Sequence, residues 1–157
     1  MFLSTRRVII FALVIIILIL LGIFELLLVN NLKKEVRYLL HINDQAISVE
    51  LADTAAERYK GLSQRNDLCA DCGLLFVFPK KEVQDFVMRD MKFSLDIIFI
   101  ADNKIVKIVS SAPPEGSDPQ IIYSSDEAVD YVLELTGDYA RKNNLRVGDR
   151  VYGLHFK

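Results

Sequence analysis

The sequence predicts a mainly β domain, a small antiparallel barrel or sandwich with two short helices, preceded by one transmembrane helix. Two observations lead to this fold class. Residues 8–24 form an unbroken apolar run directly behind Arg6 and Arg7. The rest of the chain contains several short segments in which apolar and polar residues alternate, separated by turn-forming residues, and this pattern is typical of short strands.

The apolar run predicts an uncleaved signal anchor that crosses the lipid bilayer over residues 8–29. At about 1.5 Å per residue such a helix is about 33 Å long, and the hydrocarbon core is about 30 Å thick. A cleaved secretory signal peptide is the alternative. Its apolar region is usually about 7 to 15 residues long and ends at a small-residue cleavage site, which is not found here.

The orientation of this anchor follows less directly from charge. Residues 1–7 form a short basic N-terminus, but Lys33, Lys34 and Arg37 follow on the other side, so the positive-inside bias does not decide. Signal anchors commonly keep such an N-terminus inside. We therefore expect a single-pass protein of the plasma membrane whose domain is extracytoplasmic, in the cell envelope.

Residues 30–44 are predicted to form an amphipathic juxtamembrane stalk, because Leu32, Val36, Leu39 and Leu40 recur at helical spacing. The β domain then covers residues 45–157. Its first strand is expected over residues 46–51, where Ile47, Val49 and Leu51 alternate with polar neighbours.

A short helix follows this strand, since Thr54 and Glu57 form a capping-box pattern and Gly61 ends the helix. A two-residue hairpin turn is predicted at Asp102 and Asn103, which tolerate positive φ. The Pro-rich segment 112–119 is predicted to be a long surface loop. The other expected elements are strands over residues 73–78, 83–88 (after a turn at 79–82), 95–100, 104–109, 121–123, 129–135 and 151–156, and a helix over 136–143.

Charge excludes one class of partner. The chain has 19 basic and 21 acidic residues, a net charge of −2, and no basic stripe. Proteins that bind nucleic acid need clustered Lys and Arg to neutralise phosphates. We therefore expect no nucleic-acid partner.

Several segments in order resemble the family called domain of unknown function 192. The residues that carry the resemblance are 49–58, Gly61 and Leu62, 73–78, Met88 and Arg89, 95–100, 112–114, 123–125, 131–134 and 147–149. The resemblance covers nearly the whole soluble domain and implies a compact, mostly β fold, often behind a signal sequence or anchor, with no established reaction. The chain departs from the family pattern at residues 86–89, at residues 135–137 and in lacking a Cys after the prolines, so its ligand preference is expected to differ there.

Cys69 and Cys72 are the chain's two cysteines, in a C-x-x-C arrangement. This spacing permits a disulfide, free thiols, a redox pair or half of a metal site. Zinc needs two further ligands, and His41 and His155 lack a ligand-like spacing. We therefore favour a disulfide and expect no metal and no cofactor.

Asp96 and Glu134 are carboxylates within otherwise apolar strands. An unpaired buried charge is expensive, so each carboxylate is expected either to point outward or to be buried with a partner. Arg89, earlier in the chain than Asp96, is the expected partner, and the pair either holds the fold or binds a ligand. Serine hydrolase chemistry at Tyr123 and Ser124 is disfavoured, because the chain has no G-x-S-x-G motif.

The sequence favours a non-enzymatic domain that binds a small polar ligand or a cell-envelope protein partner. The candidate ligand-binding residues are Met88, Arg89, Asp96, Pro113, Pro114, Tyr123, Ser124 and Glu134. Two alternatives remain open. One is an envelope enzyme that acts on a saccharide or peptide with paired carboxylates, and the other is a thiol-redox module that uses Cys69 and Cys72.

Overall fold

The computed structural model describes residues 5–31 and 37–156. The chain divides into two units, residues 1–36 and residues 37–157. Each unit is treated separately below.

The first unit contains one long helix, α1 (Thr5–Asn31), of 27 residues. Its described apolar side chains, which lie between Ile9 and Phe24, are exposed within their own unit. Over the described residues, no helix was found that is long and apolar enough to cross a membrane. The predicted span of residues 8–29 lies partly outside this description, since the side chains of residues 8, 12 and 26–29 are not described. Residues 32–36 of the predicted stalk also lie outside the described residues.

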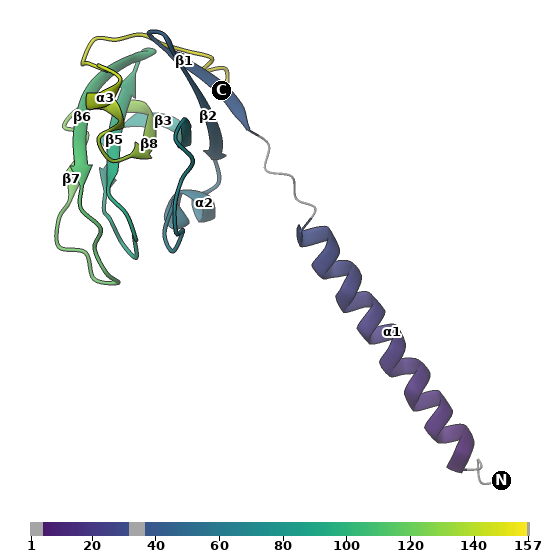
Figure 1. Cartoon of the computed structure of the whole chain (residues 1–157). Helices are drawn as coiled ribbons and strands as arrows, with labels where there is room; N and C mark the ends of the chain where they lie inside the picture. The colour runs from purple at the N-terminus through teal and green to yellow at the C-terminus, as the bar shows by residue number, and fades with distance from the viewer. Residues whose placement is uncertain (1–4, 32–36, 157) are drawn as a thin grey trace. The chain divides into compact units, whose positions relative to one another are not determined.

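The second unit is a curled seven-stranded sheet (Figure 1). Its strand order is β6-β5-β8-β3-β2-β1-β9. The strands are β1 (Tyr38–Ile42), β2 (Gln45–Ala52), β3 (Cys72–Glu82), β5 (Leu95–Ala101), β6 (Lys104–Ala112), β8 (Val129–Thr136) and β9 (Val151–Tyr152). A separate pair joins β4 (Asp85–Phe86) to β7 (Tyr123–Ser124).

The two ends of the seven-stranded sheet meet. A bridge joins Lys104 at the start of β6 to Arg150 beside β9, and the Val151 amide donates to the Asn103 carbonyl. This contact curls the sheet into a barrel-like form. The prediction of a mainly β, barrel-like domain with short helices, α2 (Ala55–Lys60) and α3 (Tyr139–Lys142), is confirmed at this level.

The expectation of a fully antiparallel sheet is wrong at one place. β2 and β3 run parallel, with Ser48 opposite Cys72 and Ala52 opposite Phe76. Parallel neighbours need a crossover connection of about a dozen residues or more. The segment from residue 53 to residue 71, which includes α2, provides that length.

The predicted helical stalk is wrong for residues 38–42, which form β1 and pair with β2. Leu40 and Ile42 are fully buried while Leu39 and His41 are exposed, so burial has the period of a strand. The β1–β2 turn at Asn43 and Asp44, with φ of 52° at Asn43, makes the hairpin.

The predicted turn at residues 79–82 is also wrong, because β3 continues to Glu82. Pro79 is tolerated since the pairing of β3 with β8 is interrupted between Val77 and Glu82. Other predicted elements are shorter in the structure: the strand over 83–88 is reduced to β4, and the strand over 151–156 is reduced to β9. The helix over 136–143 is reduced to α3. The strand predicted over 121–123 is β7, which begins at residue 123.

Two local predictions are confirmed. Thr54 and Glu57 form a reciprocal capping box at the start of α2. Asp102 and Asn103 have φ of 50° and 59° in the β5–β6 turn, which suits the twist of a tight hairpin.

Each face of the sheet has its own hydrophobic core. The inner core brings together residues from the sheet's middle and both ends, such as Leu75 of β3, Ile105 of β6 and Val151 of β9. The outer core contains Leu74, Phe76 and Phe99 together with residues of the connecting segments. The candidate site lies on this outer side.

Gly73 of β3 allows β3 and β8 to approach closely. A Cβ atom there would lie 2.8 Å from Leu135 Cδ2 and 2.9 Å from the Glu134 carbonyl oxygen. We expect Gly73→Ala to lower the free energy of unfolding by about 1 to 3 kcal/mol, because the overpacked strands must separate. Denaturant unfolding measures this change, with Gly116→Ala as the control, since a Cβ there meets nothing within 4 Å. Equal effects of the two changes would contradict the packing argument.

Candidate functional site

A cavity of about 330 Å³ lies on the outer side of the sheet, below the C-terminal end of α2. Four parts of the chain surround it: the end of α2 with its following turn, the β3 strand, the segment around β4, and the β8 strand. The residues that line it are 58–63, Phe76, Phe78, 84–87, Arg89, Met91 and Glu134.

Glu134 of β8 is the buried polar group of this cavity. It lies in one row across the sheet with Leu74 of β3 and Glu50 of β2, because Glu134 is opposite Leu74 and Leu74 is opposite Glu50. Only 5% of Glu134 is exposed, and its Oε2 atom has no hydrogen-bond partner among the described residues.

Burial determines the protonation state of Glu134. Removal from water raises the pKa of its carboxyl group to about 8, and the charge of Arg65 opposes this shift only in part. The group is therefore mainly a neutral carboxylic acid at pH 7. In that state it offers both a hydrogen-bond donor and an acceptor to whatever occupies the cavity.

Gly61 allows the backbone to lie against this carboxyl group. Its φ is +51°, and its amide donates to the Glu57 carbonyl at the end of α2. A Cβ atom at this position would be 3.4 Å from Phe76 Cζ and 3.9 Å from Glu134 Oε2. Glycine meets both requirements, the left-handed conformation and the close approach.

Aromatic rings form the apolar wall. Phe86 packs edge to face against Phe76, with ring centroids 4.8 Å apart, and more loosely against Phe78 at 6.5 Å. Such edge-to-face pairs hold ring orientation as well as burying area. The wall is thus a defined surface beside the Glu134 carboxyl group.

Basic side chains lie at the edge of the cavity. The Arg89 guanidinium is 4.1 Å from the centre of the Tyr59 ring and donates to the Tyr59 carbonyl at 3.1 Å. Arg58 donates to the carbonyls of Asp53 and Val77. Lys60 is exposed at the end of α2.

The predicted pairing of Arg89 with Asp96 is wrong. Asp96 is fully buried, and its carboxylate accepts backbone N–H groups from Ser111 at 2.8 Å, Asp138 at 2.9 Å and Ala140 at 2.7 Å. Backbone donors, including those at the start of α3, take the place of the expected arginine. Asp96 therefore joins β5 to β6 and α3.

The remaining sequence candidates do not line the cavity. Met88 is fully buried in the outer core, and its carbonyl accepts from the Glu115 amide at 3.0 Å. Pro113 and Pro114 are exposed. The structure thus brings together two of the predicted ligand-binding residues, Arg89 and Glu134.

Tyr123 and Ser124 form β7, which pairs with β4 but does not line this cavity. The Ser124 carbonyl accepts from Lys107 Nζ at 2.8 Å. Burial, and then the nearby Glu115 carboxyl group, raises the pKa of Tyr123. Both residues pair with β4, Tyr123 opposite Phe86 and Ser124 opposite Asp85.

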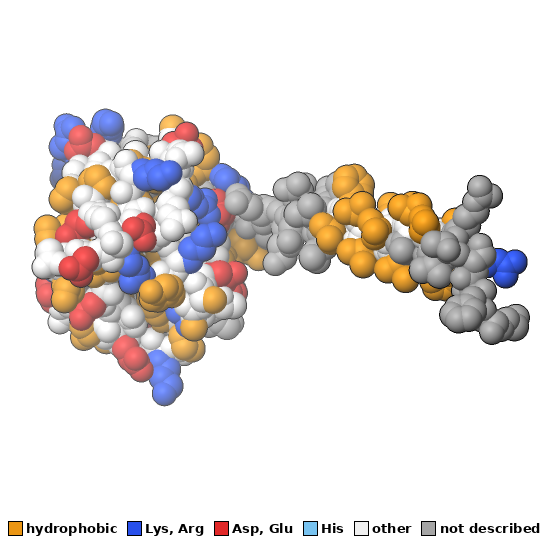
Figure 2. Space-filling model, turned by 90° about the horizontal axis from the view of Figure 1, so that it is seen from below, with side chains coloured by type: hydrophobic (Ala, Val, Ile, Leu, Met, Phe, Trp, Pro, Cys, Tyr) orange, Lys and Arg blue, Asp and Glu red, His pale blue; other side chains and the backbone are white. Residues whose placement is uncertain are grey.

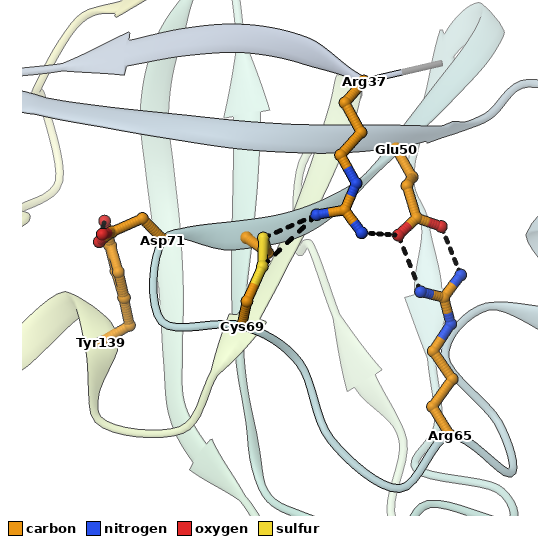
Figure 3. The surroundings of a disulfide bond; sticks show 7 residues. Arg37, Glu50, Arg65, Cys69, Asp71 and Tyr139 are labelled. Carbon is orange, nitrogen blue, oxygen red and sulfur yellow. Dashed lines mark hydrogen bonds and ion pairs between the residues drawn. A yellow bond between two sulfur atoms is a disulfide. The ribbon is translucent and has the colours of Figure 1, made fainter. Parts of the chain in front are cut away.

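Cys69 and Cys72 form a disulfide at the start of β3 (Figure 3). Arg37 Nη1 lies 2.8 Å from Cys72 Sγ and 3.4 Å from Cys69 Sγ. Figure 3 also shows that Arg37 and Arg65 converge on Glu50, at 3.2 Å from Arg37 Nη2 to Oε1 and 2.9 Å from Arg65 Nη1 to the same oxygen. A charged network therefore extends from the disulfide to Arg65, the residue whose charge acts on Glu134.

Sequence analysis missed the residues that α2 and β3 contribute, among them Tyr59, Lys60, Phe76 and Phe78. The sequence did contain a signal for the position of α2. The capping box marks where this helix begins, and Gly61 marks where it ends. Among the described residues, no group of three or more His, Cys, Asp or Glu side chains could hold a metal ion.

Charges on the domain surface are mixed. On the face seen in Figure 2, acidic and basic side chains are interspersed and no basic stripe is visible. The basic side chains at the cavity are therefore a local feature.

Comparison with solved structures gives similar folds. One is a crystal structure from Sinorhizobium meliloti 1021 named "putative transcription regulator", with 30% identity and a TM-score of 0.70, covering 76% of this chain and 95% of that chain. Another is a protein of unknown function from Novosphingobium aromaticivorans DSM 12444, with 28% identity and a TM-score of 0.69, covering 73% of this chain and 84% of that chain.

No curated protein matches the chain. The family model DUF192, described as "Uncharacterized ACR", matches residues 38–153. This range begins at β1 and ends just beyond β9, so it includes the whole sheet and the cavity. The chain therefore belongs to the DUF192 family.

Proposed function

We propose that the domain is a non-enzymatic binding module that holds a small polar ligand in the cavity around Glu134. One observation carries this proposal, the buried Oε2 atom of Glu134 without a hydrogen-bond partner among the described residues. Leaving a buried polar group unsatisfied costs about 1 to 3 kcal/mol. A ligand that hydrogen-bonds to this atom recovers that cost on binding.

The size and lining of the cavity support a small ligand. Its volume of about 330 Å³ is at the lower end of the range for small-molecule sites, about 300 to 1,000 Å³. Aromatic walls with a few polar groups at fixed places are typical of such sites. Phe76 and Phe86 supply the first feature, and Glu134 and Arg89 supply the second.

The carboxylates favour binding over hydrolysis. An enzyme acting on a saccharide needs two carboxyl groups that face each other across the substrate. Asp96 is occupied by three backbone donors, and Asp126 accepts from Lys107 Nζ at 2.5 Å. Asp85, the other acidic residue that lines the cavity, is exposed.

A cavity-filling variant tests this function. In the full chain in lipid nanodiscs, a library of monosaccharides, amino acids and short organic acids is expected to contain compounds that shift the Gly61 and Glu134 amide resonances. Val87→Trp, which fills the cavity, is expected to abolish these shifts. Val83→Trp is the matched control, because Val83 is exposed and does not line the cavity. Shifts that persist in Val87→Trp, or no shifts at these amides, would contradict the proposal.

The proposal places this module at the outer side of the plasma membrane, with residues 8–29 as its single-pass anchor and a cell-envelope protein as a further possible partner. The apolar sequence behind Arg6 and Arg7 supports the anchor, and the length of α1 is compatible with it. The disulfide is compatible with an oxidising compartment.

Membrane-impermeant maleimide applied to intact cells tests this placement. Labelling of Cys69 and Cys72 is expected only after mild reduction. Labelling that requires cell lysis but no reductant would contradict the extracytoplasmic location.

A thiol-redox module is the second candidate, because Arg37 lies against the disulfide sulfurs. A guanidinium at this place stabilises the thiolate formed on reduction. We expect Arg37→Gln to make the disulfide reduction potential more negative, as measured in dithiothreitol redox buffers. Arg65→Gln is the control, since it also removes a hydrogen-bond partner of Glu50. Equal potentials in Arg37→Gln and the unchanged chain would count against a redox function.

A further inference from the structure

The cavity has an uneven charge distribution. Its basic side chains are Arg58, Lys60 and Arg89, and its acidic side chains are Asp85 and Glu134. Glu134 is the most buried of these, and Lys60 and Asp85 are exposed. Lys60 and Asp85 therefore lie toward the opening, Arg58 and Arg89 are half-buried, and the carboxyl group of Glu134 lies at the inner end.

These three basic residues form no ion pair with a carboxylate among the described residues. Arg58 and Arg89 donate to backbone carbonyls, and both guanidinium groups lie over aromatic rings, Arg58 at 5.7 Å from the centre of the Phe78 ring. Such contacts hold the side chains in place while their charge stays uncompensated. Two positioned guanidinium groups and one ammonium group suit an anion, which arginine binds with directional hydrogen bonds.

The inner end of the cavity, at Glu134, differs in charge from the basic side chains. Burial raises the pKa of Glu134 to about 8, so at pH 7 the carboxyl group is mainly neutral and does not repel an anion. Phe76 and Phe86 form an apolar wall of the same cavity. A ligand in the cavity thus meets basic side chains, an apolar wall and a neutral carboxylic acid.

On the basis of the proposed function, we infer that the ligand is a small organic anion with an apolar body. Its charged group lies among Arg58, Lys60 and Arg89, and a polar group at its other end hydrogen-bonds to the unpartnered carboxyl group of Glu134. A cationic ligand fits this arrangement poorly. It would face three like charges against the single exposed carboxylate of Asp85, and it would lack an ionised partner inside.

Matched probes test the inference with the full chain in phosphatidylcholine nanodiscs. The probes are 4-hydroxyphenylacetate, its neutral amide, and the cation tyramine, which share a phenol group and differ in charge. Binding is measured at pH 7 from the Gly61 and Glu134 amide shifts. We expect 4-hydroxyphenylacetate to bind at least about tenfold more tightly than tyramine and the amide.

Charge variants identify the residues responsible. Lys60→Gln and Arg89→Gln are each expected to weaken 4-hydroxyphenylacetate binding several-fold more than they weaken binding of the neutral amide. Lys80→Gln is the control, because Lys80 is exposed and does not line the cavity. Lys60 is exposed, so its variant is informative even if Arg89→Gln folds poorly.

The outcomes separate the inference from the proposed function. Tyramine or the amide binding as tightly as the acid, with loss of binding in Val87→Trp, would overturn the anion class and leave the binding cavity supported. Binding of no probe would also overturn the anion class, and the wider compound library would then decide whether the cavity binds a ligand at all.

Discussion

Replacing Asp96 with Asn is expected to lower the free energy of unfolding by about 3 kcal/mol. The Asp96 carboxylate accepts three backbone N–H groups while fully buried. An asparagine of the same size has one oxygen and presents an NH₂ group to at least one of these donors. Where the NH₂ group faces a backbone N–H, the charge-assisted hydrogen bond to the carboxylate is lost and the buried N–H has no acceptor.

Denaturant unfolding of the full chain, followed by circular dichroism, measures this loss. Asp67→Asn is a matched control, because Asp67 is exposed and no hydrogen bond to its side chain is found among the described residues. Hydrogen exchange at the Ala140 amide locates the effect, since this amide donates to Asp96. Similar stabilities of Asp96→Asn and the unchanged chain would contradict the role of Asp96 as the link between β5, β6 and α3.

The second large effect is a dependence of the free energy of unfolding on pH. The pKa of Glu134 is raised by burial from 4.5 to about 8, so the folded state binds the proton more tightly than the unfolded state does. The stability that protonated Glu134 contributes is fully present below about pH 4.5 and is lost as pH rises toward 8. The loss is about 1.4 kcal/mol for each pH unit at its steepest.

Glu134→Gln removes this titration while preserving the shape of the side chain. We expect the free energy of unfolding of the unchanged chain to fall between pH 5 and pH 8, and that of Glu134→Gln to stay nearly constant. Glu57 and Asp138 have lowered pKa values, so stability linked to them is lost only in more acidic solution. Glu127→Gln, at an exposed position, is the control. Parallel pH profiles for the unchanged chain and Glu134→Gln would contradict a buried neutral Glu134.

Much of the sheet could be predicted because local chemistry agrees with the fold. Ile47 and Val49 alternate with polar residues in β2, and Asp102 with Asn103 forms the turn that joins β5 to β6. β1 was missed because Leu39 and Leu40 also fit a helical spacing. Pairing with β2 decided between the two structures, and a sequence pattern does not contain that long-range contact.

The candidate site was predicted only in part. Glu134 is predicted as a carboxylate within an apolar strand and Arg89 as the partner of Asp96, and both line the cavity. Their neighbour Gly61 comes from the crossover between β2 and β3, and Phe76 comes from β3 itself. The local sequence does not specify that these two strands run parallel. Asp96 was assigned an arginine partner because backbone donors at the start of α3 become its neighbours only after folding.

Titration of the Glu134 carboxyl group is the most direct test of a neutral, unpartnered acid in the cavity. Carbon-13 NMR of the labelled, ligand-free chain would follow its carboxyl shift from acidic to basic pH, with Glu134→Gln used to assign the signal. The account predicts a midpoint near 8. A midpoint near 4.5, the ordinary value for this group, would show an ionised carboxylate at neutral pH and contradict the account.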